Sequence, residues 1–397
     1  MSRPEHSLDL GISNSPRSRM QIPKHIQQFD YLRGLAVLLV MLFHASHDVH
    51  SFPMAKYVSF GWAGVDLFFV LSGFLITGIL FETRDRDGHF TNFYARRVLR
   101  IWPLYFALLG AMFLAVPLLV PRWGEAAMQN ARPAWAFVLF LQNLVIGPRL
   151  TGPLGPTWSL AIEEQFYFVW PLLVWLFSRK AIQRLAAIII VCSPLMRLGL
   201  ELGHVHISLY YNTLTRLDGL AVGSFLAIWL RDAKATTVKR WALAVLPVSL
   251  AGAVFLNRSW IDYSMIAIAS GAIVSLSFFF ALKNRFVLFS GRISYGLYLI
   301  HMAVFGVATK PELRRHYPHS PVLNDVTYLA LGSVLTYATA SLSWFLFESQ
   351  ILRAKSWFGS SPGTEITLPH CSVDSEELVP TTNASTMQLD NQLIARG

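Results

Sequence analysis

Long apolar segments separated by short polar stretches follow one another from residue 33 to residue 347. A helix that crosses the hydrocarbon core of a membrane needs about 20 predominantly apolar residues. Segments that approach this length lie at residues 33–50, 62–81, 101–120, 158–177, 182–198, 214–230, 241–256, 260–282, 293–308 and 326–347. The pattern therefore predicts an all-α polytopic membrane protein with about ten transmembrane helices in a single bundle.

A further apolar segment at 134–146 is short for a span. The stretch 147–156 that follows it contains three prolines and three glycines and cannot form a regular helix. If 134–146 does not cross, lysines and arginines concentrate in the loops on the side of the N-terminus, as cytoplasmic loops do. We therefore expect both termini in the cytoplasm, and 134–157 to be a re-entrant or outer-surface segment.

Composition supports a membrane protein. Hydrophobic residues make up 54% of the chain and charged residues only 14%, which excludes a disordered chain and argues against a soluble enzyme. The net charge of +10 is better explained by basic cytoplasmic loops than by nucleic-acid binding. We predict a cytoplasmic N-terminal tail (1–28), a membrane domain (29–350) and a polar, disordered cytoplasmic tail (351–397), in a multi-pass protein of the cell inner (plasma) membrane.

Polar groups inside apolar helices are costly and mark candidate functional sites. Arg33 and His44 are eleven residues apart, which places them on one face of a helix and about 16 Å apart along its axis. Arg33 would then lie at the cytoplasmic mouth and His44 near or beyond the middle of the bilayer, with Asp48 on nearly the same face. The alternatives are a membrane anchor for Arg33 and a structural bundle histidine for His44.

Three carboxylates are predicted to share the outer half of the bundle with His44. Asp66 lies near the outer start of one apolar segment, and Glu163 and Glu164 lie near the outer start of another. A histidine within reach of carboxylates is an arrangement for general-base catalysis. Structural ion pairs would also account for Asp66 and for one of the two glutamates.

A cluster of arginines begins another apolar segment. Arg96, Arg97 and Arg100 occupy one or two helical turns, and a guanidinium group matches the geometry of phosphate. An anchor to anionic lipid heads is the alternative. A phosphorylated donor with a long arm, such as acyl-coenzyme A, could bind these arginines and extend its reactive end towards His44. Weaker candidates are Trp158, Asp218 and His301, which we assign to acceptor binding.

Six segments together resemble the membrane-bound acyltransferase family 3. In chain order they are FDYLRGLAVLLVMLFH, GVDLFFVLSGFLITG, FYARRVLRIWPLY, GPTWSLAIEEQFYFVWPL, RLDGLAVG and ISYGLYLIH. The resemblance extends over roughly residues 27–350. The resemblance implies a ten-helix core that transfers acyl groups, often acetyl from acetyl-coenzyme A, to hydroxyls of glycans, lipid-linked sugars or macrolides. It implies that Arg33 and His44 are the family's R-x10-H pair, with His44 catalytic, and that the arginine cluster binds the donor.

These observations lead to one hypothesis and two rivals. In the hypothesis an O-acetyltransferase uses acyl-coenzyme A as co-substrate, without a permanently bound cofactor or metal, and acts on a hydroxylated acceptor. His44 is its base or carries the acyl group in a relay, and Arg33, Glu163, Glu164 and Asp66 assist it. The first rival is a proton-coupled secondary transporter that uses His44, Asp66, Glu163 and Glu164 as a relay. The second is a lipid-binding scaffold that uses the arginines only as anchors.

Overall fold

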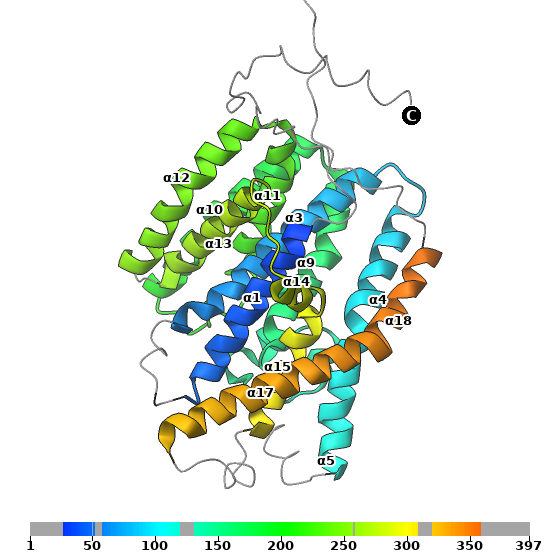
Figure 1. Ribbon diagram of the computed structural model, residues 1–397. Helices are drawn as coiled ribbons and strands as arrows, with labels where there is room; N and C mark the ends of the chain where they lie inside the picture. The colour runs from blue at the N-terminus through cyan, green and yellow to red at the C-terminus, as the bar shows by residue number, and fades with distance from the viewer. Residues whose placement is uncertain are drawn as a thin grey trace, which may run out of the picture.

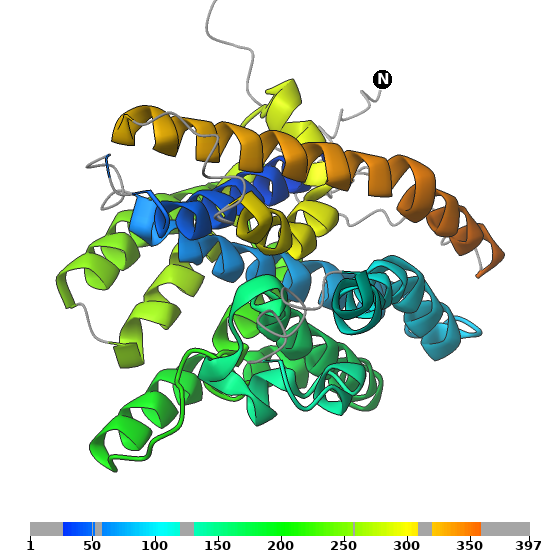
Figure 2. The same ribbon diagram turned by 90° about the horizontal axis from the view of Figure 1, so that it is seen from below.

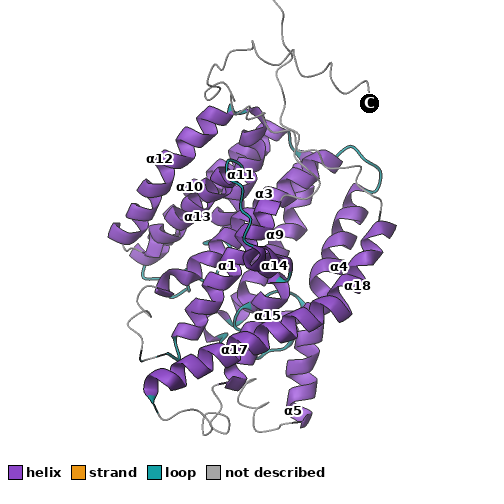
Figure 3. Ribbon diagram, in the orientation of Figure 1, coloured by secondary structure: helices purple, strands orange, loops and turns teal. Residues whose placement is uncertain are grey.

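The computed structural model describes residues 27–49, 51, 58–119, 131–256, 259–308 and 320–358. Every regular element in these ranges is helical (Figure 3). The longer helices are α1 (Gln27–Ser46), α3 (Ala63–Thr83), α4 (His89–Gly110), α9 (Thr157–Leu176), α10 (Arg179–Leu202), α11 (Leu217–Asp232), α12 (Ala235–Leu256), α13 (Ser259–Ser277), α14 (Arg285–Arg292), α15 (Ser294–Ala308) and α17 (Pro321–Ser343). The predicted all-α class is confirmed.

Helices α1 and α3 run through the middle of the bundle (Figure 1). On one side lie α10, α12 and α13, and on the other lie α4 and the short α18 (Ser349–Arg353). Helix α3 packs closely on α11, because a Cβ at Gly73 would collide with the carbonyl oxygen of Leu220 and one at Gly223 with that of Val70. Small residues allow helices to approach closely where lipid provides no hydrophobic driving force. The structure therefore supports a packing role for Gly73.

Two features frame this core. Helix α14 meets α15 at a bend of 82°, and the pair could form one broken span. Helix α17 packs on α15 along one edge of the bundle (Figure 2) and continues through the π-helical turn Trp344–Glu348 into α18. Helix α4 likewise continues through a π-helical turn, Ala111–Ala115, into α5 (Val116–Leu119). The bent pair α14–α15 thereby packs against α1, and α18 packs against α4.

The segment predicted not to cross forms only short turns. It contains α7 (Trp135–Val138), α8 (Gln142–Val145) and two 3-10 turns, Gly147–Arg149 and Gly152–Leu154. A four-residue helix is about 6 Å long, far less than the hydrocarbon thickness. The turns pack against α9 and α15 and help to form the pocket described below.

The structure gives fewer candidate spans than the ten predicted. In the part of the chain that it describes, seven helices are long and apolar enough to cross a membrane, or eight if the bent pair α14–α15 is one span. Helices α9 and α11 occupy two of the predicted positions but are not among them. Helix α11 has only 16 residues, which is short for a span. Helix α9 has 20 residues, but the polar side chains of Glu163, Glu164 and Gln165 lower its hydropathy.

The sidedness of the termini stays a prediction, because residues 1–26 and 359–397 lie outside the described residues. The predicted tail boundary at residue 350 falls inside α18. Helical structure continues through the 3-10 turn η6, Ala354–Trp357.

Candidate active site

His44 and His301 form a directly hydrogen-bonded pair. Nδ1 of His301 lies 2.7 Å from the carbonyl oxygen of Tyr298 and 3.1 Å from that of Leu297. Since a carbonyl only accepts, this Nδ1 carries the hydrogen, and Nε2 of the neutral ring is an acceptor. That Nε2 lies 3.1 Å from Nδ1 of His44, which is also 3.0 Å from the carbonyl oxygen of Val40. His44 therefore carries its hydrogen on Nδ1 and keeps the lone pair on Nε2.

His44 lines a cavity of about 830 Å³, which we call the histidine pocket. This volume is within the usual range for small-molecule sites, about 300–1,000 Å³. Aromatic rings form much of its wall, and its polar groups include His47, Asp48 and Asp262. The aromatic residues that line it are Phe43, Trp62, Trp158, Tyr210, Tyr211, Tyr263, Tyr298, Phe305 and Tyr328. Burial raises the pKa of the Tyr210 phenol well above its ordinary value, so this hydroxyl stays protonated and can donate a hydrogen bond.

A second cavity, of about 100 Å³, lies on the arginine side of the bundle, and we call it the arginine pocket. Arg33, Arg97 and Arg100 line it, together with Glu163 and Tyr167. The Arg97 guanidinium lies over the Tyr167 ring, 5.5 Å from its centroid. Arg33 donates to Asp30 over 3.2 Å. The structure thus brings Arg97 and Arg100, two of the three arginines predicted to bind the donor, to one cavity with Arg33.

The two pockets meet at Val65 and Tyr298, because both residues line both cavities. The Tyr298 hydroxyl lies 2.6 Å from Ser159 Oγ and donates to the carbonyl oxygen of Pro156 over 3.2 Å. Tyr298 is also one helical turn before His301 on α15. A ring held at its hydroxyl and next to the histidine pair therefore separates the pockets.

Arg96, the third arginine of the predicted cluster, contacts another part of the chain. Nε of Arg96 donates to the carbonyl oxygen of Phe358, near the end of the described chain, over 3.2 Å. The paired glutamates also diverge, as expected of adjacent helical positions. Glu163 accepts from Ser72 over 2.7 Å, whereas Glu164 accepts from Trp102 over 3.1 Å. Glu163 consequently belongs to the arginine pocket, and Glu164 faces α4.

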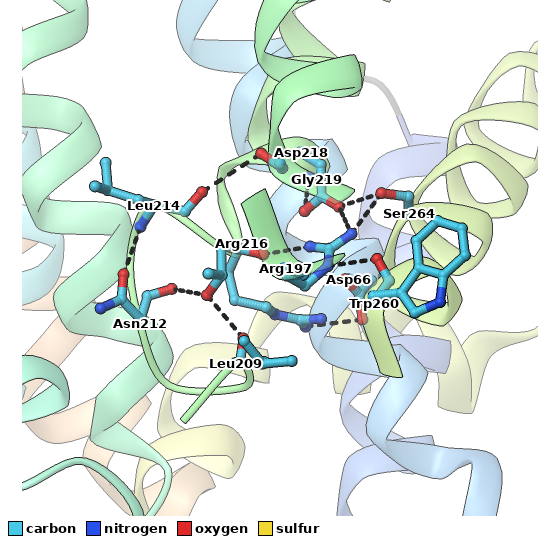
Figure 4. Close-up of polar contacts among 12 residues, drawn as sticks. Asp66, Arg197, Leu209, Asn212, Leu214, Arg216, Asp218, Gly219, Trp260 and Ser264 are labelled. Atoms are coloured by element: carbon cyan, nitrogen blue, oxygen red, sulfur yellow. Dashed lines mark hydrogen bonds and ion pairs between the residues drawn. The ribbon is translucent and has the colours of Figure 1, made fainter. Parts of the chain in front are cut away.

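Asp66 and Asp218 lie in a buried polar network between α3, α10, α11 and α13 (Figure 4). Asp66 accepts from Arg216 over 3.0 Å, and both side chains are fully buried. The Arg216 guanidinium lies 4.3 Å from the ring centroid of Tyr263 and 5.0 Å from that of Tyr210. One buried cation therefore fixes two rings of the histidine pocket, and its charge is balanced by Asp66.

Asp218, predicted from the sequence to bind the acceptor, lies in the same network. One of its carboxylate oxygens accepts from Arg197 over 2.9 Å and from Ser264 over 2.6 Å, and the other accepts from the backbone amide of Gly219 over 3.1 Å. Asp218 is fully buried, and it lines neither the histidine pocket nor the arginine pocket described above. Its role in acceptor binding stays a prediction.

The structure places the other two residues predicted to bind the acceptor, His301 and Trp158, in different surroundings. His301 is fully buried and contacts His44, a place from which it can position that ring. Trp158 does line the histidine pocket, where its ring centroid is 4.6 Å from that of Tyr210. The sequence analysis also missed Tyr298 and Tyr210 as site residues. Their position within the segments ISYGLYLIH and YYNTLTRLDG was the available signal.

The chain is thus a helical bundle in which a hydrogen-bonded histidine pair borders the larger of two adjoining pockets. Comparison with known proteins agrees: the acyltransferase domain family matches residues 26–345, and this chain belongs to that family. Membership favours an enzyme over the transporter and the scaffold.

Two relatives are informative. The chain is 30% identical to the peptidoglycan O-acetyltransferase OatA of Listeria monocytogenes, over 83% of this chain and 56% of that protein. It is 27% identical to the O-acetyltransferase OatA of Staphylococcus aureus, over 80% of this chain and 57% of that protein. The chain thus spans little more than half the length of these relatives. No solved structure matches it significantly.

Proposed function

We propose that this protein is a membrane O-acyltransferase that moves an acyl group, acetyl in the first place, from acyl-coenzyme A to a hydroxyl of a cell-surface glycan or glycolipid. The observation that carries the proposal is the His44–His301 pair. Its hydrogen bonds leave Nε2 of His44 unprotonated at the wall of a large pocket, as a general base requires.

The arginine pocket supplies the donor side of the reaction. Guanidinium groups bind phosphate oxygens through paired hydrogen bonds, and Arg33, Arg97 and Arg100 line one cavity. The arginine pocket adjoins the histidine pocket at Val65 and Tyr298, and this arrangement suits a donor with an extended arm and a reactive end. Because basic residues concentrate on the cytoplasmic side of membrane proteins, we expect the arginine pocket to face the cytoplasm. Coenzyme A esters are available to an enzyme of the inner membrane on that side.

The histidine pocket supplies the acceptor side. Its aromatic walls offer flat apolar faces for sugar rings, and its polar groups can fix the orientation of hydroxyls. A glycan acceptor also agrees with the names of the two relatives, both of them O-acetyltransferases and one named for peptidoglycan. The Tyr210 hydroxyl and Asp262 are suited to bind the acceptor.

In the proposed step, His44 Nε2 removes the proton from the acceptor hydroxyl while the oxygen attacks the thioester carbonyl. The carbon–sulfur bond then breaks, the ester forms, and the imidazolium returns the proton to the departing thiolate. His301 stabilises the imidazolium by accepting from Nδ1 of His44 throughout. The products are the O-acylated acceptor and free coenzyme A.

Mass spectrometry of surface glycans and membrane lipids tests the proposal. Cells that lack the gene would be compared with cells complemented by the wild-type protein or by His44→Gln. We expect one species to gain the mass of one acyl group only with the wild-type protein. Identical glycan and lipid masses in all three strains would overturn the proposed function.

A further inference from the structure

The last helical segment of the described chain folds back onto the donor side of the bundle. Helix α18 and the turn η6 both contact α4, which carries the arginine cluster. Arg96 on α4 donates to the carbonyl oxygen of Phe358, directly after η6, over 3.2 Å. The family match ends at residue 345, so these residues are a contribution of this chain beyond the matched domain.

Lys355 on η6 lies among like charges. The charged groups that act on it most strongly are Arg100, Arg97, Arg96 and Arg33. Burial, and then the repulsion by these four arginines, lowers the pKa of Lys355 from about 10.5 to about 7. The carboxylates near these arginines are already engaged: Asp30 accepts from Arg33, Glu163 from Ser72, and Glu348 from Ser343. Bringing a fifth cation to this place is unfavourable unless an anion joins it.

We propose that Lys355 completes a phosphate-binding site with Arg33, Arg97 and Arg100, and that the turn Ala354–Trp357 covers the bound phosphates. The inference rests on the proposed function only in naming acyl-coenzyme A as the first ligand. The same chemistry would recognise the phosphate of an anionic lipid headgroup.

A consequence of this arrangement is proton uptake. In the empty site, Lys355 is only partly protonated at neutral pH, and a bound phosphate stabilises its charged form and raises its pKa. Ligand binding then takes up one proton between pH 7 and the higher pKa of the complex. By linkage, affinity is greatest below pH 7 and falls by up to about tenfold per pH unit above it.

The test uses the full-length protein in phosphatidylcholine nanodiscs and measures the Kd of acetyl-coenzyme A from pH 6.5 to 9. The wild-type Kd should rise with pH as described. Lys355→Arg keeps its charge at every pH, so its Kd should stay low and nearly flat. Lys355→Gln should bind about 10–100-fold more weakly than wild type at pH 6.5 and should approach wild type at pH 9. Lys239→Gln, which removes an exposed lysine of α12, should follow the wild-type profile.

A second arm replaces part of the lipid with phosphatidylglycerol and measures its retention by the same variants. Lys355→Gln could retain less phosphatidylglycerol than wild type in a pH-dependent way and still bind acetyl-coenzyme A as wild type does. That result would support the phosphate site and assign it to lipid. If Lys355→Gln binds both ligands with the affinity and the pH profile of the wild-type protein, the inference is overturned. Failure of the wild-type protein to bind acetyl-coenzyme A would instead count against the proposed donor.

Discussion

His301 holds His44 by a hydrogen bond of 3.1 Å between Nε2 of the one ring and Nδ1 of the other. The backbone carbonyls of Tyr298 and Leu297 fix the proton of His301 on Nδ1, so the peptide chain itself sets the tautomer of both imidazoles. In many enzymes a carboxylate orients the base. Here a second histidine has that position, and its own partners are backbone groups of α15.

The first prediction concerns this pair. His301→Phe removes one of the two acceptors for His44 Nδ1 and leaves only the carbonyl oxygen of Val40, so the imidazolium loses the ring that stabilises it in the proposed step. We expect kcat for acyl transfer to fall by on the order of 10²–10⁴-fold, with little change in donor affinity. His47→Gln is the matched control, because His47 lines the same pocket but hydrogen-bonds to the carbonyl oxygen of Phe43. Equal effects of the two changes would contradict the positioning role.

The second prediction concerns the buried ion pair of Asp66 and Arg216. Asp66→Leu leaves the guanidinium uncompensated in the bundle, which typically costs about 3–5 kcal/mol of stability. The midpoint of thermal unfolding in detergent should fall markedly, and the double variant Asp66→Leu/Arg216→Met should recover part of the loss. A single variant that unfolds like wild type but cannot transfer the acyl group would instead give Asp66 a direct catalytic role.

A third prediction concerns the boundary between the pockets. Val65 and Tyr298 line both cavities, so the side chain of residue 65 limits the size of the acyl group that can reach His44. Val65→Ala should raise the ratio of butyryl to acetyl transfer by about tenfold, the usual worth of a methylene in an apolar pocket. Val70→Ala, a change at a fully buried valine of the same helix, should leave this ratio unchanged.

The fourth prediction separates donor binding from membrane anchoring. Arg97→Ala should raise the KM for acetyl-coenzyme A by about 10–100-fold, because a hydrogen bond to a charged group is lost. Arg184→Ala removes an exposed arginine of α10 and should have no such effect. If both variants keep the wild-type KM but retain less anionic lipid to the same degree, the arginines act as anchors.

Helix geometry was enough to predict where Arg33 and His44 lie. A spacing of eleven residues returns to the same helical face, and the structure places the two side chains in adjoining pockets along α1. The arginine cluster was predicted in the same way, since its members are neighbours in sequence. The apolar segments also located the long helices, although length and polarity remove α9 and α11 from the candidate spans.

The partners of the buried charges could not be predicted. Asp66 and Arg216 are 150 positions apart, and His44 and His301 are 257 apart. Spacing along the chain carries no information on such contacts, which depend on how whole helices pack. Reasoning from depth in the membrane therefore grouped Asp66, Glu163 and Glu164 with His44. In the structure these carboxylates instead accept hydrogen bonds from Arg216, Ser72 and Trp102.

The most direct test of the account is single-turnover transfer by purified His44→Gln in proteoliposomes, with saturating labelled acetyl-coenzyme A and peptidoglycan fragments free of O-acetyl groups. Donor affinity would be measured in the same preparation. We predict that the variant binds the donor within about threefold of wild type while the transfer rate falls by on the order of 10²–10⁴-fold. Transfer at the wild-type rate would contradict the assignment of His44 as the base.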